Sequence, residues 1–258
     1  MSPPPPNPPQ EIPDFLLVLP SYREAGRLPQ YLASLVETLA SAPFRTDILV
    51  VDDGSPAEDQ RELRAAFSPI QSGNCRVLPA LLLTKNGKKG DAILQGWSSL
   101  PAKWKAFADA DGSTDAAEVR RVLGEIRDRD PAQTASYFAV RSRSGPLRVR
   151  RTRSKLILSR LFSILAGLAL RAPAIDFQCG FKVIPGSALP KVERYIAGRG
   201  FCFDPALFLA LRSVGIAVET VPIAWSDQPG GKVSAWRNGP GMLAGLAILA
   251  TCGPGPRR

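Results

Sequence analysis

Three short polar segments each follow an apolar run in the first half of the sequence. They are Ser21–Glu24, Asp52–Ser55 and Asp109–Asp111. In an Asp-x-Asp pair such as the third, one carboxylate can hold a divalent metal while the other contacts a ribose or a diphosphate. Mg²⁺ and Mn²⁺ favour oxygen ligands and share them with substrate phosphates. Taken alone, the same pair could be an acidic turn that caps the helix after it.

Composition excludes several kinds of catalysis. The 258 residues include no histidine, which excludes a histidine general base, a Ser-His-Asp triad and a His-ligated zinc ion. The four cysteines are widely spaced and form no Cys-x-x-Cys pair, so we expect a reduced protein without a zinc or redox motif. An enzyme of this composition must use carboxylates, basic residues, hydroxyls or a metal held by oxygen.

Positive charge dominates the chain and is concentrated in one stretch. Lys and Arg total 33 against 23 for Asp and Glu, and the formal net charge is +10. Eight basic residues and no acidic ones lie between Arg141 and Arg160. This run is either a solvated loop or a site for phosphate or a membrane surface. Nucleic acid is not an expected partner, because no helix-turn-helix, zinc-finger or aromatic RNP-like string accompanies the run.

Strands and helices are expected to alternate through the first 140 residues. This order predicts an α/β fold with a mostly parallel central sheet flanked by helices, in which ligands bind beyond the carboxyl ends of the strands. All three polar segments then share one edge of the sheet. A GxGxxG string is absent after the first strand, which disfavours a dinucleotide site. The expected strands are Phe15–Leu19, Asp47–Val51, Val77–Leu83, Lys105–Ala108 and Tyr137–Val140, and the expected helices are Leu28–Ala40, Ala57–Ala66, Asp91–Ser99 and Ala116–Arg127.

Three segments are expected along the chain. Residues 1–13 are Pro-rich and predict a disordered tail without the apolar core of a secretory signal. Residues 14–237 are expected to form the main domain, and residues 238–258 an apolar C-terminal segment. Leu156–Leu170 could be a buried core helix or a helix lying in a bilayer interface, and Met242–Cys252 could be a second interfacial helix. Neither run reaches the roughly 20 residues that a spanning helix needs.

Five strings together carry a resemblance to a known family. Leu19–Glu24, Val50–Ser55 and Ala108–Ser113 resemble the corresponding motifs of glycosyltransferase family 2, whose members have the GT-A fold, a single Rossmann-like domain. Ile175–Lys182 is similar to the DTQCGFK string of the dolichyl-phosphate β-glucosyltransferase and polyprenyl-phosphate mannosyltransferase-like branch. Lys85–Gly90 is similar to the KNRGKG loop of that branch. The resemblance extends from about residue 14 to residue 237.

The resemblance implies a role for individual residues. Nucleotide-sugar binding would fall to a set at the strand ends, namely Pro20, Tyr22, Glu24, Val51, Asp53, Lys89, Asp109 and Ala110. Asp111 would hold Mg²⁺ or Mn²⁺, with Ser113 near the metal. Lys232 and an Arg of the basic run would approach the diphosphate. Arg153 fits this second role best, although Arg151 and Lys155 fit nearly as well.

The implied reaction is the inverting transfer of a hexose from UDP-glucose or GDP-mannose to a polyprenyl or dolichyl phosphate. It would take place at the cytoplasmic face of a membrane, with the protein bound peripherally to the anionic surface. An ionised lipid phosphate needs no histidine base, whereas a soluble glycan hydroxyl would require a carboxylate base such as Asp204. Asp176, Gln178 and Asp204 are the candidates for the sugar or acceptor region. Departures from the branch at Gly87–Lys88, Phe177 and Ala206 concern the sugar and acceptor preference rather than the nucleotide site.

Overall fold

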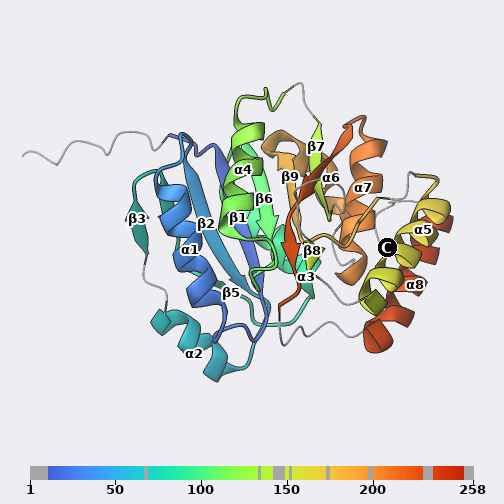
Figure 1. Ribbon diagram of the computed structural model, residues 1–258, viewed down its shortest axis with the longest axis horizontal. Coiled ribbons are helices and arrows are strands. Elements are labelled where there is room, and N and C mark those ends of the chain that lie inside the picture. The colour runs from blue at the N-terminus through green and yellow to red at the C-terminus, as the bar shows by residue number, and fades with distance from the viewer. Residues whose placement is uncertain are drawn as a thin grey trace, which may run out of the picture.

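The computed structural model describes residues 11–66, 69–132, 135–141, 149–150, 153–172, 175–196, 200–228 and 235–252. A mixed β-sheet runs through the middle of this part of the chain, with helices on both faces (Figure 1). Its strands are β1 (Phe15–Ser21), β2 (Thr46–Asp52), β3 (Ile70–Ser72), β4 (Cys75–Val77), β5 (Leu81–Leu82), β6 (Trp104–Ala108), β7 (Ser136–Arg141), β9 (Phe181–Pro185) and β10 (Val218–Ile223). A separate parallel pair joins β8 (Val149–Arg150) to β11 (Trp225–Ser226).

Eight α-helices and two 3₁₀ turns lie in the described residues. The helices are α1 (Leu28–Ala40), α2 (Ala57–Ala66), α3 (Lys89–Ser99), α4 (Ala116–Arg127), α5 (Arg153–Leu170), α6 (Leu189–Ile196), α7 (Phe203–Ser213) and α8 (Ala235–Cys252). The turns are η1 (Gly186–Ala188) and η2 (Gly200–Cys202). None of the helices in these ranges is long and apolar enough to cross a bilayer.

The strand order is β10-β7-β9-β6-β1-β2-β4-β3, with β5 also paired to β2. β1 runs parallel to both of its neighbours, β2 and β6, whereas β9 is antiparallel to β6 and β7. Because β2, β1 and β6 are adjacent and parallel, their carboxyl ends lie at one edge of the sheet. This edge is where the sequence places the three polar segments.

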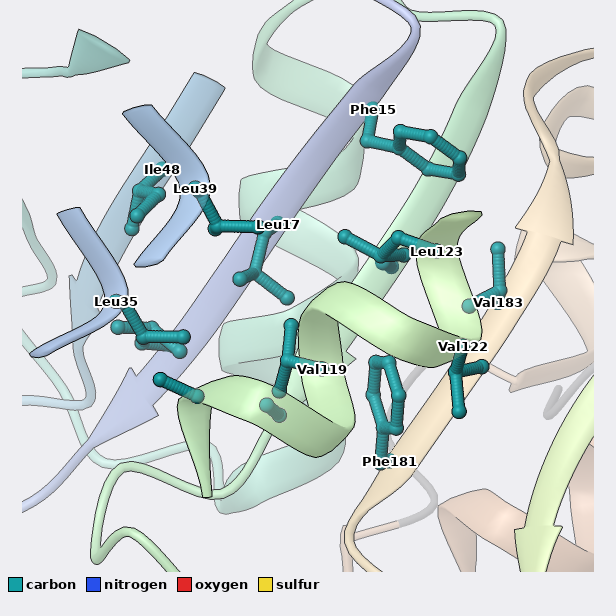
Figure 2. Packing of buried hydrophobic residues seen from close by; sticks show 14 of the residues in the cluster. Phe15, Leu17, Leu35, Leu39, Ile48, Val119, Val122, Leu123, Phe181 and Val183 are labelled. Carbon is teal, nitrogen blue, oxygen red and sulfur yellow. The ribbon is translucent and has the colours of Figure 1, made fainter. Parts of the chain in front are cut away.

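The apolar strands are buried on both faces, as expected for parallel strands covered by helices. Successive side chains of a strand point to opposite faces, so Phe15, Leu17 and Leu19 enter one core while Leu16 and Val18 enter the other. Residues of α1 and α4 close the first core against β1, β2 and β9, as Figure 2 shows. In that view α1 contributes Leu35 and Leu39, and α4 contributes Val119, Val122 and Leu123.

Helices α3, α6 and α7 contribute to the second core, together with α5 and α8. α5 and α8 contact each other and lie side by side at the end of the molecule opposite β3 (Figure 1). Their inner faces supply Ala166 and Leu170 from α5 and Leu246 and Leu249 from α8. Leu156–Leu170 is therefore partly a core helix, although several of its other apolar side chains remain exposed.

One predicted strand is wrong as a single element. Val77–Leu83 divides into the ends of β4 and β5, because Pro79 in its middle has no backbone N–H and cannot continue a ladder. The other strands and helices predicted in the first 140 residues are present, with ends that match or differ by one or two residues. α5 begins three residues before the predicted Leu156–Leu170 run, and α8 begins seven residues before the predicted Met242–Cys252 run. The mostly parallel sheet flanked by helices is confirmed, with β3 and β9 as the antiparallel strands of the described part.

Candidate active site

Adjacent strands bring the first two polar segments into direct contact. Ser21 and Asp52 are register partners at the ends of β1 and β2, and the Asp53 N–H donates to the Ser21 carbonyl at 2.8 Å. Pro20 and Val51 are likewise opposite each other, one residue earlier. Two predicted nucleotide-binding residues, Pro20 and Val51, therefore lie within one paired stretch of backbone, and two more, Tyr22 and Asp53, directly follow it.

Asp52 is buried and supports the loop after β2. One of its carboxylate oxygens accepts the Ser55 N–H at 2.8 Å and the Gln60 Nε2 at 2.9 Å, and the other accepts the Ser55 hydroxyl at 2.5 Å. The same hydroxyl accepts the Arg23 N–H at 2.9 Å, which ties this loop to the Ser21–Glu24 segment. These contacts give Asp52 a structural role.

Asp53 faces a different loop. Its Oδ1 accepts the N–H of Gly87 at 2.8 Å, in the segment that leads into α3. Burial raises the pKa of the Asp53 carboxyl, opposed by hydrogen bonds from the Gly87 and Lys88 N–H groups. Gly54 follows with a φ of +67°, and a Cβ there would come within 2.6 Å of the Lys85 carbonyl carbon. The segment from Lys85 to Gly87 therefore packs directly against the Asp53 turn.

Lys89 and Asp109 form the central ion pair of the edge. Lys89 is the first residue of α3, and its Nζ lies 2.6 Å from Oδ1 of Asp109, the residue after β6. Burial alone would lower the lysine pKa, but the negative charges of Asp109, Asp204 and Asp111 raise it. Burial and the charge of Asp111 raise the pKa of Asp109, while Lys89 opposes that rise. The ammonium thus stays charged and balances part of the carboxylate cluster.

Asp111 lies in a turn that begins α4. Its Oδ1 accepts the Ser113 N–H at 2.9 Å, and Gly112 between them has a φ of +75°. The Tyr31 hydroxyl donates to the Thr114 carbonyl at 2.7 Å and fixes this turn to α1. The predicted alternative, an acidic helix cap, belongs instead to Asp115, whose side chain accepts the Glu118 N–H.

The carboxylates of Asp109 and Asp111 fit a metal that is shared with a substrate. Within the described ranges, no group of three His, Cys, Asp or Glu residues could by itself hold an ion. Mg²⁺ is commonly bound through one or two carboxylates together with substrate phosphates. The donors here are oxygens only, and Asp111 is partly exposed. The set is therefore suited to a metal–diphosphate complex rather than to a free ion.

Two of the predicted base and ribose residues are on the loop after β1. Tyr22 is exposed, with the Arg23 guanidinium carbon 5.4 Å from its ring centroid. Glu24 forms a 2.6 Å ion pair with Arg27 at the start of α1. Ala110 is buried between Asp109 and Asp111. In this structure the Glu24 carboxylate stabilises its own loop.

The turn before β9 forms the wall behind Asp109. The Asp109 N–H donates to the Gly180 carbonyl at 2.8 Å, and a Cβ on Gly180 would collide with the Asp109 carboxylate. Asp176 in the same turn forms a bidentate pair with Arg141, at 2.5 Å to each oxygen. Burial disfavours the Asp176 charge, but the Arg141 hydrogen bonds and charge outweigh it and lower the pKa. Arg141, the first residue of the basic run, is therefore engaged in structure.

Asp204 and Gln178 complete the predicted acceptor region. Asp204 lies at the start of α7, and its Oδ1 is 2.7 Å from the Nζ of buried Lys182 on β9. This contact is held by charge, because no aligned hydrogen bond reaches that oxygen. The Gln178 amide is 3.9 Å from the Met242 sulfur on α8. A carboxylate that pairs with a buried ammonium is a poor choice for a general base, so the geometry disfavours a mechanism that needs Asp204 as one.

Comparison with known proteins decides the family. The profile described as Glycosyl transferase family 2 matches residues 16–192, well over half of the chain. The chain belongs to glycosyl transferase family 2. The family assignment based on the sequence motifs is confirmed.

Curated relatives match over most of this family 2 chain. A dolichyl-phosphate beta-glucosyltransferase of Saccharomyces cerevisiae is 28% identical over 90% of this chain and 73% of its own length. The protein of the same name from Homo sapiens is 27% identical over 84% of this chain and 68% of its own. The relatives belong to the branch that the Ile175–Lys182 string indicated.

Solved structures confirm the GT-A fold of this family 2 chain. A glucosyl-3-phosphoglycerate synthase from Mycobacterium tuberculosis, crystallised with Mn²⁺, UDP and phosphoglyceric acid, superposes with a TM-score of 0.65. The two sequences are 14% identical, and the superposition covers 93% of this chain and 79% of the synthase chain. A mannosyl-3-phosphoglycerate synthase from Rubrobacter xylanophilus gives a TM-score of 0.58 at 17% identity, over 93% and 73% of the two chains.

Some of the predicted site residues lie outside the described part of this family 2 chain. One residue near the site, Lys182, is not predicted from the sequence. Lys232 and Arg151 lie outside the described residues, and the side chains of Arg153 and Lys155 lie outside them too. Sequence reasoning gave Lys182 no role, although a single lysine in the apolar string Phe181–Pro185 is a signal for a buried charge.

Proposed function

We propose that this protein is an inverting glycosyltransferase that moves glucose from UDP-glucose to a dolichyl or polyprenyl phosphate. The observation that carries the proposal is the arrangement of Asp53 after β2 and of Asp109 and Asp111 after β6, at the carboxyl ends of the two strands that flank the parallel strand β1. The names of the curated relatives support glucose as the sugar and dolichyl phosphate as the acceptor. GDP-mannose is the alternative donor that the assay below includes.

Donor binding is assigned to the edge formed by β1, β2 and β6. Asp53 would accept a hydrogen bond from the base, within a pocket formed by Pro20, Tyr22, Glu24 and Val51. Asp109 and Ala110 would contact the ribose and diphosphate. Lys89 would add positive charge beside them, which its position 2.6 Å from Asp109 supports.

Leaving-group departure requires positive charge near the diphosphate, because negative charge develops there as the sugar leaves. Asp111, with Ser113 beside it, would hold Mg²⁺ or Mn²⁺, and the bound ion would supply part of that charge. Arg153 and Lys232 would supply the rest. We also propose that residues 14–237 form the catalytic domain and that residues 238–258 belong to the membrane-facing part. Residues 1–10 of the predicted tail lie outside the described residues, whereas the Pro13 carbonyl accepts the Lys103 N–H.

Acceptor activation needs no base if the acceptor is a phosphate, because its oxygen is already ionised near neutral pH. That oxygen forms the new bond to the anomeric carbon as the bond to the diphosphate breaks. The nucleophile enters opposite the leaving group, so the configuration inverts. Gln178 and Asp204 would line the acceptor side, with Asp176 holding the turn of Gln178 through Arg141.

A lipid acceptor requires the protein to reach a membrane, and α5 with α8 offers a surface for it. Both helices lack acidic residues, and both expose large apolar side chains. We propose that this surface, the α5–α8 face, binds peripherally to anionic lipid at the cytoplasmic face of the membrane. Its exposed apolar residues are Leu161, Ile164, Leu165 and Leu168 on α5 and Leu243 and Ile248 on α8.

The test is a donor panel with one acceptor. UDP-glucose and GDP-mannose are each incubated with the protein, a short dolichyl phosphate and Mg²⁺ or Mn²⁺, and organic-soluble labelled product is measured. The expected product is lipid-linked glucose in β-linkage from UDP-glucose, identified by its anomeric proton coupling. An α-linked product would contradict the inverting mechanism. Transfer of mannose but not glucose would show that GDP-mannose is the donor. Hydrolysis of the donor without lipid-linked product would contradict a lipid phosphate as the acceptor.

A further inference from the structure

Lys182 is a fully buried cation whose ammonium meets three oxygens from two other segments. Its Nζ donates to the carbonyls of Phe177 at 3.0 Å and Cys179 at 2.7 Å, and lies 2.7 Å from Asp204 Oδ1. The Phe138 ring centroid is 5.0 Å away. A buried ion pair is costly to desolvate, and well-packed apolar residues often stabilise a fold as well or better. Stability alone therefore does not account for a lysine here.

The contacts of Lys182 join the two segments that flank the Lys89–Asp109 pair. One is the turn from Asp176 to Gly180, whose last residue packs directly against the Asp109 carboxylate. The other is the start of α7, where Asp204 lies. A shift of Lys182 would therefore move both the wall behind Asp109 and the carboxylate of Asp204.

A second lysine lies close to the same aromatic ring. Lys89 Nζ is 4.8 Å and Lys182 Nζ is 5.4 Å from the ring centroid of Phe107, the residue before Ala108 at the end of β6. The Asp204 charge raises the pKa of both Lys89 and Asp109, so Asp204 interacts electrostatically with the Lys89–Asp109 pair. The four charges form two pairs in one cluster, Lys182 with Asp204 and Lys89 with Asp109.

We propose that Lys182 is a positioning residue of the transfer reaction. It holds Asp204 and the 176–180 turn in register with Asp109, and acts on the chemical step through Asp204 rather than by touching the substrate. This inference rests on the proposed function for its kinetic readout. Loss of Lys182 should lower kcat far more than it raises donor KM or the Kd of UDP, since Asp53 and its loop do not depend on it. A displacement of about 1 Å can cost roughly 100-fold in rate.

The test is a double-mutant cycle with a matched control. Lys182→Met, Asp204→Asn and the double variant are compared with Lys105→Met. Lys105 is also a buried lysine, on the neighbouring strand β6, and its Nζ contacts the Leu100 carbonyl away from the site. We expect kcat to fall about 100-fold in each single variant and no further in the double variant. Lys105→Met should lower Tm yet keep kcat within about threefold of the parent.

Two results would overturn the proposal: additive losses in the double variant, or normal kcat in Lys182→Met. If Lys182→Met fails to fold, the proposal is tested by amide hydrogen exchange of the Asp204→Asn variant. Faster exchange in residues 175–180 is expected, and unchanged exchange contradicts the proposal. A wild-type protein without lipid transfer would refute the proposed function only, because the exchange measurement still reports whether the ion pair holds the turn.

Discussion

At the scale of single residues, neighbouring carboxylates differ in what surrounds them. Asp52 accepts three hydrogen bonds within its own loop and with Gln60, so its charge is compensated. Asp53 has backbone N–H groups as partners, and burial still raises its pKa. A raised carboxyl pKa means that ionising the group in the folded protein costs stability. The Asp53 carboxylate therefore costs the fold stability, and its proposed role in donor binding gives a reason for its presence.

Asp53→Asn should stabilise the protein increasingly as pH rises. Below the ordinary carboxyl pKa of 3.8 both states are protonated and the substitution has little effect. As pH rises through the raised pKa of the folded state, the wild type loses stability that the neutral amide does not lose. The difference in Tm between variant and wild type should grow between acidic and neutral pH, reaching about 2–4 °C if the gain is about 1 kcal/mol. Thermal unfolding at several pH values measures it.

The neighbouring substitution is the control. Asp52→Asn replaces one of the two acceptor oxygens with an NH₂ group, which would face either the Ser55 hydroxyl or the Ser55 N–H and the Gln60 amide that now donate, so Tm should fall at neutral pH. Donor affinity should fall in Asp53→Asn despite its higher Tm. A stabilised Asp52→Asn, or an Asp53→Asn difference that shrinks with pH, would contradict this reading of the two carboxylates.

Asp111 and Asp115 lie four residues apart and should differ sharply in activity. Asp111→Asn removes the charge proposed to hold the metal, and we expect kcat to fall about 100-fold or more with Tm little changed. Asp115→Asn keeps an N-cap acceptor for the Glu118 N–H and should leave kcat within about twofold. Lipid-linked product formation across a Mn²⁺ titration measures both. Equal activity in the two variants would remove Asp111 from the metal site.

At the scale of elements, the period of the apolar residues predicts most of the strands and helices, and the polar residues at the strand ends predict the position of the site. The apolar runs before Asp52 and Asp109 located β2 and β6, and their polar ends located the site, because parallel strands share an edge. The Arg141–Asp176 pair joins residues 35 positions apart, and no local pattern encodes such a contact. The sequence pattern predicts no strand at β9, whose first two residues end the Ile175–Lys182 string. The antiparallel placement of β9 between β6 and β7 depends on long-range packing, which periodicity does not report.

Gly180 should be indispensable to the turn before β9, and Gly124 should not. A Cβ on Gly180 would occupy the space of the Asp109 carboxylate, so Gly180→Ala should reduce kcat about 100-fold by displacing Asp109. A Cβ on Gly124, inside α4, would meet only Phe44 at 3.7 Å. Gly124→Ala should keep full activity and gain about 0.5–1 kcal/mol of stability, as alanine favours the helix. Assay and urea unfolding of both variants check this, and an active Gly180→Ala would refute the packing role.

At the scale of the whole molecule, the α5–α8 face lies at one end and is connected to the site region through α8. β3 forms one edge of the sheet, while α5 and α8 lie at the opposite end of the molecule (Figure 1). On its inner side α8 reaches the site region, since the Cys202 thiol donates to the Met242 carbonyl at 3.3 Å and Gln178 contacts Met242. Cys202 immediately precedes α7 and Asp204. A membrane bound to the α5–α8 face would therefore lie close to the proposed acceptor side.

Leu168→Glu should weaken membrane binding without weakening the fold. Leu168 is 73% exposed on α5, so the substitution breaks little packing but adds a negative charge to a face without acidic residues. We expect the fraction of protein that sediments with anionic vesicles to fall about tenfold, because both apolar contact and charge attraction are lost. Ile70→Glu on β3, also exposed at 46%, makes the same chemical change at the opposite end and should leave sedimentation unchanged. Equal losses in the two variants would indicate a general charge effect, and no loss in Leu168→Glu would move the membrane contact to another face.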